Sequence, residues 1–484
     1  MDLHYLALLL LAIQGVLGAF DTLYHHELTV ALPQKITARR ELLIHAIRAS
    51  IYSVMFIGLA YWSWQGAWSL ILPALFVVEL GLTLWDFVVE DKTRLLPASE
   101  RITHTVLAIN AGAFMALLLL VCVQWWSQDS AIVWTNYGWL SAFLALCGVG
   151  VGLSALRDAW AVRQLKRFAA HEAQKPAIHF AEQPQSVLVT GGTGFVGQVL
   201  IQHLLADGHQ VIVLTRSPKQ AAWLFAGKVL CIQKLDELAP RHPIDVVINL
   251  AGARILGLPW TKRRKATLQR SRVALTEHLL QALAQRPKPP HLLLSASAIG
   301  YYGIQPQGNQ DYLDENSPPQ AIFMSQLCQD WEQASTQALQ QGMSVALMRF
   351  GLVIGRQGGA VPMMLLPVKL GVGGRMGSGQ QFDDLIRGVA HVWQRSEQSQ
   401  AATVTAYNFT APGVVTQATF MQTAGELLKR PTFFPTPAFA VRTLLGEQAD
   451  LLLEGQKVVP QALLASGFKF QYPQLKDALQ AVIK

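Results

Sequence analysis

The sequence predicts an α/β protein with a doubly wound parallel sheet, followed by a small, mainly helical C-terminal domain and preceded by an all-α transmembrane bundle of about five helices. Three observations lead to this prediction. Five apolar stretches lie within the first 160 residues, strands alternate with helices from residue 186 onward, and a glycine-rich turn follows the first of those strands. We therefore divide the 484 residues into a transmembrane domain (1–160), a linker (161–185), a sheet domain (186–410) and a C-terminal domain (411–484).

The composition supports the membrane assignment, since 51% of the residues are hydrophobic and only 14% are charged. Most of the apolar stretches approach the ~20 residues that cross a bilayer. They are Leu6–Phe20, Ile44–Trp62, Leu70–Val88, Val106–Val123 and Tyr137–Leu156. Basic residues occupy the first and third connecting loops and the segment after the fifth stretch, whereas the other loops have none. The positive-inside rule then predicts an integral protein of the plasma or inner membrane, with its N-terminus outside and the sheet domain in the cytoplasm.

The net charge of +8 does not indicate a nucleic-acid partner, because the basic residues lie at the ends of apolar segments and form no basic recognition element. Four cysteines are present without a Cys-x-x-Cys pair: Cys122, Cys147, Cys231 and Cys328. This pattern argues against both a disulfide framework and a zinc cluster.

The first element of the sheet domain predicts a nucleotide site. The apolar run Val187–Val189 ends in a glycine cluster, and an amphipathic helical pattern begins at once behind it. In a Rossmann-like strand–turn–helix, one glycine makes the turn, one lets the backbone approach a pyrophosphate, and one lets the helix pack on the strand. The alternative is a β-turn with a helix behind it. The candidate cofactor-binding residues are Gly191, Thr193, Gly194, Phe195, Val196 and Gly197.

The second strand, Gln210–Thr215, is followed by Arg216. An acidic residue near this point would bind a ribose 2′-hydroxyl, whereas an arginine accommodates a 2′-phosphate. The cofactor is therefore expected to be NADP(H) rather than NAD(H). The alternative is a solvated loop arginine.

The later elements keep the alternation of strands and helices that is typical of a mostly parallel sheet. We expect strands at Ile244–Asn249, His291–Ser295 and Ser344–Met348, and helices near Ala274–Gln285 and Gln329–Gln341.

Several motifs make the chain from residue 186 to its end resemble the NAD(P)-dependent epimerase/dehydratase family, an atypical branch of the extended short-chain dehydrogenases with a C-terminal domain of unknown function. The motifs are Thr190–Gly197, Asn249–Gly252, Ser295–Gly303, Trp331-Glu332, Arg349–Gly355, Gly373-Gly374 and Phe433–Pro437. The resemblance implies that Leu250, Ala251 and Gly252 line the adenine and ribose side. It also implies that Ser295 lies at the nicotinamide and that Ser297 matches the catalytic serine. The alternative is that these serines only end a buried strand.

Two departures from the family pattern are visible. The segment that matches the Tyr-x-x-x-Lys acid/base motif reads Phe323–Leu327 and has neither group. The acid/base group could instead come from Tyr302, from Tyr301 or from the thiol of Cys328. We take Tyr302 with Ser297 as the candidate catalytic pair. After Gly379 the chain runs directly into Asp383, which predicts the loss of a strand near the substrate cleft.

Two functions from different classes follow. The first is a membrane-anchored NADP(H)-binding oxidoreductase or epimerase-like enzyme that acts on a small or lipid-associated substrate. The second is a non-catalytic NADP(H) sensor coupled to a membrane partner.

The membrane part contains carboxylate and histidine pairs at i and i+4, which share a helix face. The pairs are Asp21 with His25, Glu41 with His45, Asp86 with Glu90, and Glu100 with His104. Ionisable groups inside membranes usually face a bundle interior or a site, and carboxylates and histidines on four helices form di-iron and di-manganese centres. We take His25, His45, Glu90 and His104 as candidate ligands of a metal or haem-type site. The alternative is ordinary interfacial charge, since the Glu-x-x-His spacing of those centres is absent.

Overall fold

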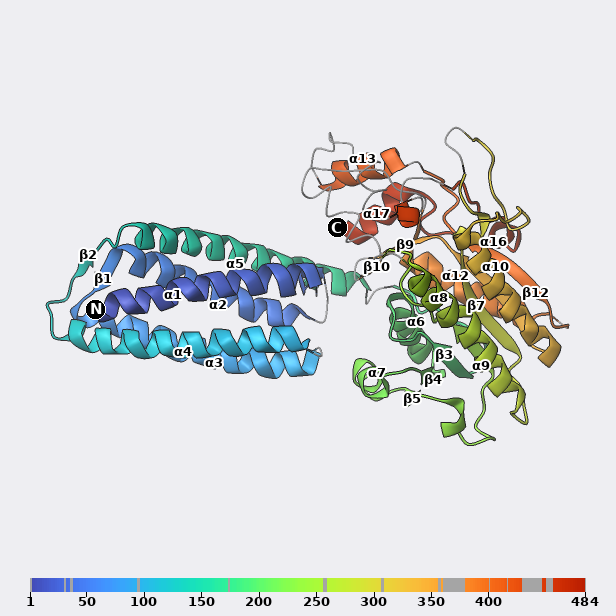
Figure 1. Cartoon of the computed structure of the whole chain (residues 1–484), viewed down its shortest axis with the longest axis horizontal. Helices are drawn as coiled ribbons and strands as arrows, with labels where there is room; N and C mark the ends of the chain where they lie inside the picture. Colours follow the sequence, from blue (N-terminus) through green and yellow to red (C-terminus); the bar gives the residue numbers. More distant parts are fainter. Residues whose placement is uncertain are drawn as a thin grey trace. The chain divides into compact units, whose positions relative to one another are not determined.

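The structure is a computed structural model that describes residues 2–29, 32–34, 38–93, 96–172, 175–255, 259–305, 309–355, 358–359, 379–399, 401–415, 417–428, 446–449 and 456–483. It forms two compact units, Met1–Lys175 and Pro176–Lys484. Figure 1 shows both units, coloured along the chain. The motifs predicted at Gly373-Gly374 and Phe433–Pro437 lie outside the described residues.

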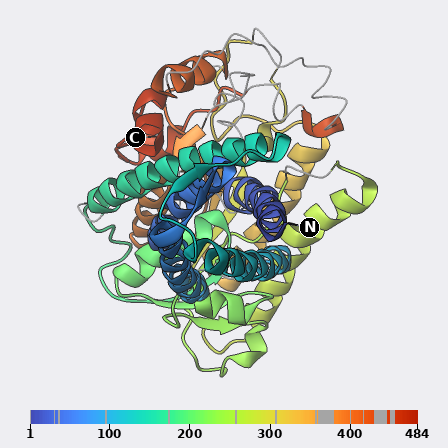
Figure 2. The same cartoon turned by 90° about the vertical axis from the view of Figure 1, so that its left-hand side faces the viewer.

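The first unit is a bundle of long helices, which Figure 2 shows nearly end-on. A π-helix, Asp21–Thr29, continues the first helix without a break. Two short strands, β1 (Trp62–Trp64) and β2 (Ile132–Trp134), pair antiparallel, so the two loops without basic residues meet at one end of the bundle. The long helices are α1 (Leu3–Phe20), α2 (Arg39–Tyr61), α3 (Ile71–Thr93), α4 (Ala98–Trp126) and α5 (Trp139–Glu172).

Each long helix is long and apolar enough to cross a membrane, and only 22 to 39% of each apolar window is buried inside the bundle. Large apolar side chains such as Val77, Ile109, Val123 and Leu153 point outward. An apolar outer surface of this extent is unusual for a protein surrounded by water alone.

The linker was predicted to begin at residue 161. This boundary is wrong, because α5 continues to Glu172. The extra turns have an apolar face. Val162 and Leu165 pack against Leu32, Ala38 and Leu42, and this small cluster stabilises the helix beyond its apolar stretch.

The second unit contains the predicted doubly wound sheet, and the α/β prediction is confirmed. The seven strands are all parallel and follow the order β12-β8-β7-β6-β3-β4-β5. The sequence analysis did not predict the two edge strands. The strands are β3 (Ser186–Thr190), β4 (Gln210–Leu214), β5 (Leu230–Ile232), β6 (Val246–Asn249), β7 (Leu292–Ala298), β8 (Ser344–Phe350) and β12 (Val404–Phe409).

Helices cover both faces of this sheet, as the continuous apolar strands require. In β3, Val187 and Val189 pack with α6 (Phe195–Ala206) and α12 (Phe382–Glu397), whereas Leu188 faces the other layer. That layer contains α9 (Leu275–Ala284) and the end of α10 (Phe323–Thr336) with the 3₁₀ turn behind it. The remaining helices of this part are α7 (Pro218–Leu224) and α8 (Lys262–Gln269).

The predicted loss of a strand after Gly379 is wrong. A short strand, β11 (Gly379–Gln381), pairs parallel with β9 (Leu352–Gly355), and β10 (Gly358–Gly359) pairs on the other side of β9. The pairing takes three residues of β11, and α12 begins directly after it at Phe382. The sequence analysis expected a longer strand pattern there and found none.

The described C-terminal helices are α13 (Gln417–Leu428), α16 (Gln461–Ala465) and α17 (Leu475–Ile483). Helices α13 and α17 form a small core of their own with Ile354. Leu463 and Phe468, by contrast, belong to the main core of the sheet. The segment after residue 410 therefore packs as part of the second unit.

Candidate functional site

The glycine-rich turn has the geometry of a phosphate-binding loop. Gly191 has φ +69°, a left-handed conformation that favours glycine, and its carbonyl oxygen accepts a 2.9 Å hydrogen bond from the Gly194 amide. A Cβ on Gly191 would lie 2.6 Å from the Leu250 carbonyl oxygen, and one on Gly197 would lie 2.5 Å from that of Gly191. Only glycine lets strand, turn and helix approach this closely.

The first turn of α6 faces the open side of this loop. Gly194 is the exposed N-cap residue, and it has no side chain to cap the helix. The following residues Phe195, Val196 and Gly197 contribute the first amides of the helix, where the macrodipole favours an anion. Gln198 donates a 2.7 Å hydrogen bond from its side chain to the Thr193 carbonyl and fixes the loop. This cradle fits a pyrophosphate.

The end of β6 is tied to the same loop through buried hydrogen bonds. Thr190 donates to Asn249 (2.6 Å) and accepts from the Ala251 amide (3.2 Å), while Asn249 donates to Thr276 on α9 (2.8 Å). The predicted residues Leu250 and Ala251 are thereby held beside the phosphate loop.

The third predicted residue of this segment, Gly252, is exposed and lies under a basic side chain. A Cβ on Gly252 would lie 3.0 Å from the guanidinium of Arg272, which donates to the Ala253 carbonyl and lies over the Trp331 ring. Burial lowers the pKa of Arg272 from its ordinary value.

Arg216 is exposed at the carboxyl end of β4, in the turn before α7. Ligands of open parallel sheets bind outside this edge of the sheet. The position is compatible with the 2′-phosphate role predicted from the sequence.

The two predicted serines lie on β7, and both hydroxyls form side-chain hydrogen bonds. The Ser295 hydroxyl lies 2.8 Å from that of Ser335 on α10, and Ser297 donates to Glu332 Oε1 at 2.6 Å. Glu332 in turn accepts two 2.8 Å hydrogen bonds from the guanidinium of Arg349. All of these side chains are buried.

Tyr302 belongs to the same network and does not face an open site. Its hydroxyl accepts from Arg349 (2.9 Å) and donates to Asn408 (2.7 Å), and the side chain is 1% exposed. Burial raises the pKa of the Tyr302 hydroxyl to about 12, against the opposing effect of Arg349. This geometry argues against Tyr302 as an acid/base group.

The two substitute candidates have different surroundings. Burial, followed by the Glu332 carboxylate, raises the pKa of the Cys328 thiol to about 12, so this cysteine is a poor nucleophile. Tyr301 is partly exposed, and its ring lies 3.6 Å from the Arg349 guanidinium carbon.

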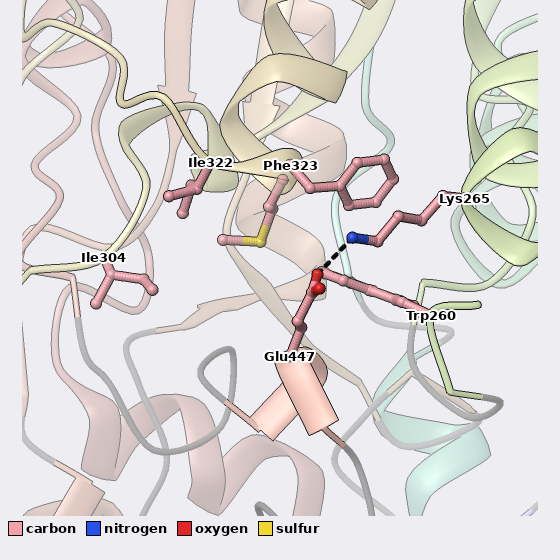
Figure 3. A pocket seen from close by; sticks show the side chains of 7 residues that line it. Trp260, Lys265, Ile304, Ile322, Phe323 and Glu447 are labelled. Carbon is pink, nitrogen blue, oxygen red and sulfur yellow. Dashed lines mark hydrogen bonds and ion pairs between the residues drawn. The ribbon is translucent and has the colours of Figure 1, made fainter. Parts of the chain in front are cut away.

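A cavity of about 330 Å³ opens beside the start of α10. Figure 3 shows Trp260 and Phe323 on either side of Lys265, whose ammonium forms a 2.6 Å ion pair with Glu447. The same ammonium lies 4.7 Å from the centre of the Phe323 ring. Ile304, Ile322 and Met324 complete the apolar lining.

The sequence analysis did not predict the lining residues Trp260, Lys265 and Glu447. One signal was visible in advance: Thr261 caps α8 by accepting from the Arg264 amide, which places Lys265 in the first turn behind an aromatic residue. Nothing in the sequence pairs Lys265 with a carboxylate 182 positions away.

The predicted metal ligands lie in the first unit. His45, Glu90 and His104 belong to groups of three side chains whose ligand atoms lie within 4.8 Å of one another. His25 belongs to no such group among the described residues, and its Nδ1 lies 2.8 Å from Asp21 Oδ1.

The parallel sheet, the glycine-lined loop and the open N-terminus of α6 define the second unit as an NAD(P)-binding protein of the Rossmann class. Residues 187–404 match the model of the NAD dependent epimerase/dehydratase family, and residues 436–482 match a domain of unknown function, DUF1731. The chain belongs to this epimerase family, as the resemblance of its motifs predicted.

Relatives match over nearly their whole length. The chain is 36% identical to the chloroplastic epimerase family protein SDR39U1 homolog of Arabidopsis thaliana over 315 residues, which is 63% of this chain and 88% of that protein. It is 37% identical to the epimerase family protein SDR39U1 of Homo sapiens, over 61% of this chain and 99% of that protein. More than a third of this chain therefore lies outside each match.

Similar solved structures support the assignment of the fold. The structure of human epimerase family protein SDR39U1 (isoform 2) with NADPH is similar with a TM-score of 0.53 and 32% identity, covering 62% of this chain and 99% of that one. A UDP-galactose 4-epimerase is similar at 17% identity with a TM-score of 0.50, over 62% of this chain and 98% of that one, and shows the fold alone.

Proposed function

We propose that the protein is a membrane-anchored, NADP(H)-binding enzyme of the epimerase family, of oxidoreductase or epimerase type. The observation that carries the cofactor assignment is the loop around Gly191 and Gly197, where the backbone leaves no room for a side chain and α6 starts without a side-chain cap. The human relative determined with NADPH and the exposed Arg216 both favour NADP(H) over NAD(H).

A bound nicotinamide supplies hydride transfer, and the residues of this chain bind and orient the reactants. The first amides of α6 bind the pyrophosphate, and Arg216 binds the 2′-phosphate. The hydrogen bonds of Thr190 and Asn249 hold the Leu250–Ala251 backbone against the cofactor side of the sheet. Ser297 and Arg349, which share the Glu332 carboxylate, keep the end of β7 rigid.

The cavity at the start of α10 is the proposed substrate site. Its volume of about 330 Å³ falls in the range of small-molecule pockets. Trp260, Phe323 and the aliphatic side chains favour an apolar group, while the Lys265–Glu447 pair offers one cation and one anion at the opening. This lining suits a small or lipid-associated molecule that has both an apolar part and a polar or anionic group.

The helical bundle is the proposed membrane anchor. Its outward apolar side chains and the basic residues at alternate loops support an N-terminus outside and a cytoplasmic second unit. A reporter fused after Arg167 should be active only on the cytoplasmic side, and one inserted at 65–67 only on the outer side. Activity of the Arg167 fusion on the outer side would overturn the orientation.

The sensor alternative rests on the predicted loss of the Tyr-x-x-x-Lys groups, since Phe323 is expected where the family motif has a phenol. Turnover separates the two functions. Absorbance at the nicotinamide band is followed while metabolite extracts are added to the full-length protein with NADPH. An enzyme consumes NADPH in at least one extract, whereas a sensor binds it without turnover in all of them.

Cofactor binding is tested by Gly194→Val. Gly194 is exposed, and a Cβ there would lie 3.1 Å from the Gly191 carbonyl oxygen, so valine should cost some stability without unfolding the second unit. A branched side chain at the cap would block the approach of the pyrophosphate. We expect loss of NADPH binding in titration calorimetry with a cooperative thermal transition retained. The control is Gly342→Ala, which strains a glycine of φ +79° in open space; it should lower stability and leave NADPH binding unchanged. Micromolar NADPH binding by Gly194→Val would show that the glycines only form a turn.

A further inference from the structure

Seven side chains that can bind metal ions converge inside the helical bundle, from four different helical segments. They form three groups, each with its three ligand atoms within 4.8 Å of one another. The groups are Asp21 with His26 and His104, Glu41 with His45 and Glu90, and Glu90 with Glu100 and His104. The segments are the π-helix behind α1, and α2, α3 and α4.

The way in which the groups overlap indicates two neighbouring ions. The first two groups share no residue, so each can surround its own ion. The third group contains His104 from the first and Glu90 from the second, and so joins the two. The rings of His26 and His45 also stack at 4.6 Å with an angle of 12°, which places the first two groups side by side.

The donor set lies away from water. Glu41, Glu90 and Glu100 are 0% exposed, and the side chains of His45 and His104 are 11% and 12% exposed. Carboxylates held this close together repel one another, and His104, which lies 3.2 Å from Asp21 Oδ2 and 3.4 Å from Glu90 Oε2, offsets part of that repulsion. A divalent cation would offset it further. Buried carboxylates and imidazoles that point inward from four helices are the ligands of dinuclear centres in bundles.

The π-helix explains why His26 joins the first group. A widened turn brings residues i and i+5 onto one face, so Asp21 and His26 face the same side, with His26 Nε2 3.3 Å from Asp21 Oδ2. π-Helical turns are rare and occur frequently at functional sites. The α-helical i, i+4 spacing used in the sequence analysis selected His25 instead.

A second layer of side chains orients these donors. His25 Nδ1 lies 2.8 Å from Asp21 Oδ1, and Asp86 Oδ2 lies 3.1 Å from His45 Nε2. Arg48 holds Asp86 with a 2.7 Å hydrogen bond and also donates to Glu79. Histidine ligands of metals usually hold a carboxylate with their second nitrogen, as His45 does here.

We propose that the bundle contains a dinuclear site for first-row divalent metal ions, of iron or manganese type. One ion is bound by Asp21, His26 and His104, the other by Glu41, His45 and Glu90, and Glu100 lies between them. Imidazole and carboxylate donors without thiolate suit these ions. This site lies in the unit that the family models do not cover, so it goes beyond the proposed NADP(H)-dependent function.

The test uses the full-length protein in detergent, stripped with a chelator and reloaded without oxygen with Fe(II) alone or Mn(II) alone. After desalting, we expect two ions per chain by elemental analysis, and an exchange-coupled spectrum of the Mn(II) pair in electron paramagnetic resonance. Glu90→Gln and His104→Gln each remove a donor that joins the two groups, and should leave less than one ion per chain. Asp86→Asn should keep both ions with affinity lower by about tenfold or more.

The matched control is His4→Gln. His4 is a buried imidazole on α1, about 26 Å along the helix from Asp21, and it packs on Trp125 and Tyr137. This control should keep two ions, and NADPH binding should be retained in every variant as the sign of an intact second unit.

Three results would overturn the proposal. One is wild-type protein that keeps less than about 0.2 ions per chain, since a preformed, buried set of ligands should retain its metal through desalting. Another is an electron paramagnetic resonance spectrum of the Mn(II)-loaded wild-type protein that shows only isolated, uncoupled Mn(II) ions. The third is equal loss of metal in His4→Gln and His104→Gln.

Discussion

Replacing Glu332 by glutamine should strongly destabilise the second unit, because it leaves the Arg349 guanidinium charged and buried. Arg349 is 4% exposed and Glu332 is 7% exposed. The two form a bidentate pair, with both N···O distances at 2.8 Å. The other partners of Arg349 are neutral: the Tyr302 hydroxyl, the Glu315 carbonyl oxygen and the Tyr301 ring.

The size of the effect follows from this geometry. Breaking a buried ion pair by removing one partner costs about 3–5 kcal/mol of unfolding free energy. The glutamine oxygen can still accept one of the two hydrogen bonds, and the neutral partners solvate part of the charge. We therefore expect the lower end of the range, about 3 kcal/mol.

The assay is urea unfolding of the fragment Pro176–Lys484, followed by tryptophan fluorescence. A fragment of this length is suitable because relatives match over up to 99% of their own chains. The matched control is Glu447→Gln, which breaks the Lys265 pair. These side chains are 28% and 61% exposed, so the loss should stay below about 1 kcal/mol. Equal effects of the two substitutions would refute the reasoning.

Three further outcomes are expected. Arg216→Asp should shift the preference from NADP(H) toward NAD(H) by at least about tenfold, or 1.4 kcal/mol; equal ratios of the two dissociation constants in wild type and variant would contradict it. Burial raises the pKa of Tyr302 from 10.0 to about 12, so its stabilising effect is complete below pH 10 and is lost as the pH rises toward 12. Tyr302→Phe should therefore flatten the fall in unfolding free energy above pH 10, and an unchanged slope would argue against a buried phenol. Leu327→Lys should destabilise the fragment by at least about 2 kcal/mol in urea unfolding, because Leu327 is 3% exposed, whereas Phe323→Tyr at the cavity should cost less than half of that.

The central strands and the phosphate loop could be predicted because their signals are local. Val187–Val189, the three glycines and the amphipathic helix behind them lie within 20 consecutive residues. The edge strands β5 and β12 were not predicted because edge strands are often short or show only a weak alternation of apolar and polar residues. Val404 at the start of β12 is exposed, and β5 has only three residues.

The site was predictable only where its residues follow one another in the sequence. Leu250 and Ala251 lie beside the loop as expected, since they continue β6. Tyr302 was misjudged because its burial depends on Arg349 and Asn408, which come from two distant strands. In the bundle, His26 and not His25 belongs to a group of three metal-capable side chains among the described residues, and no pattern in the sequence indicates the π-helix that places it there.

Phe323 and Leu327, the residues expected at the Tyr and Lys positions of Tyr-x-x-x-Lys, have surroundings that the sequence alone could not show. Phe323 and Leu327 lie one turn apart on α10, yet their surroundings differ: Phe323 lines the cavity, and Leu327 is buried. A lysine at 327 would have to leave its charge in that buried position. The ammonium beside the Phe323 ring comes instead from Lys265 on α8, and its carboxylate partner from Glu447. In the part of the chain that the structure describes, Lys265 is the cationic side chain that lines this cavity. At the proposed substrate site, charge recognition would therefore depend on α8 and the C-terminal segment together.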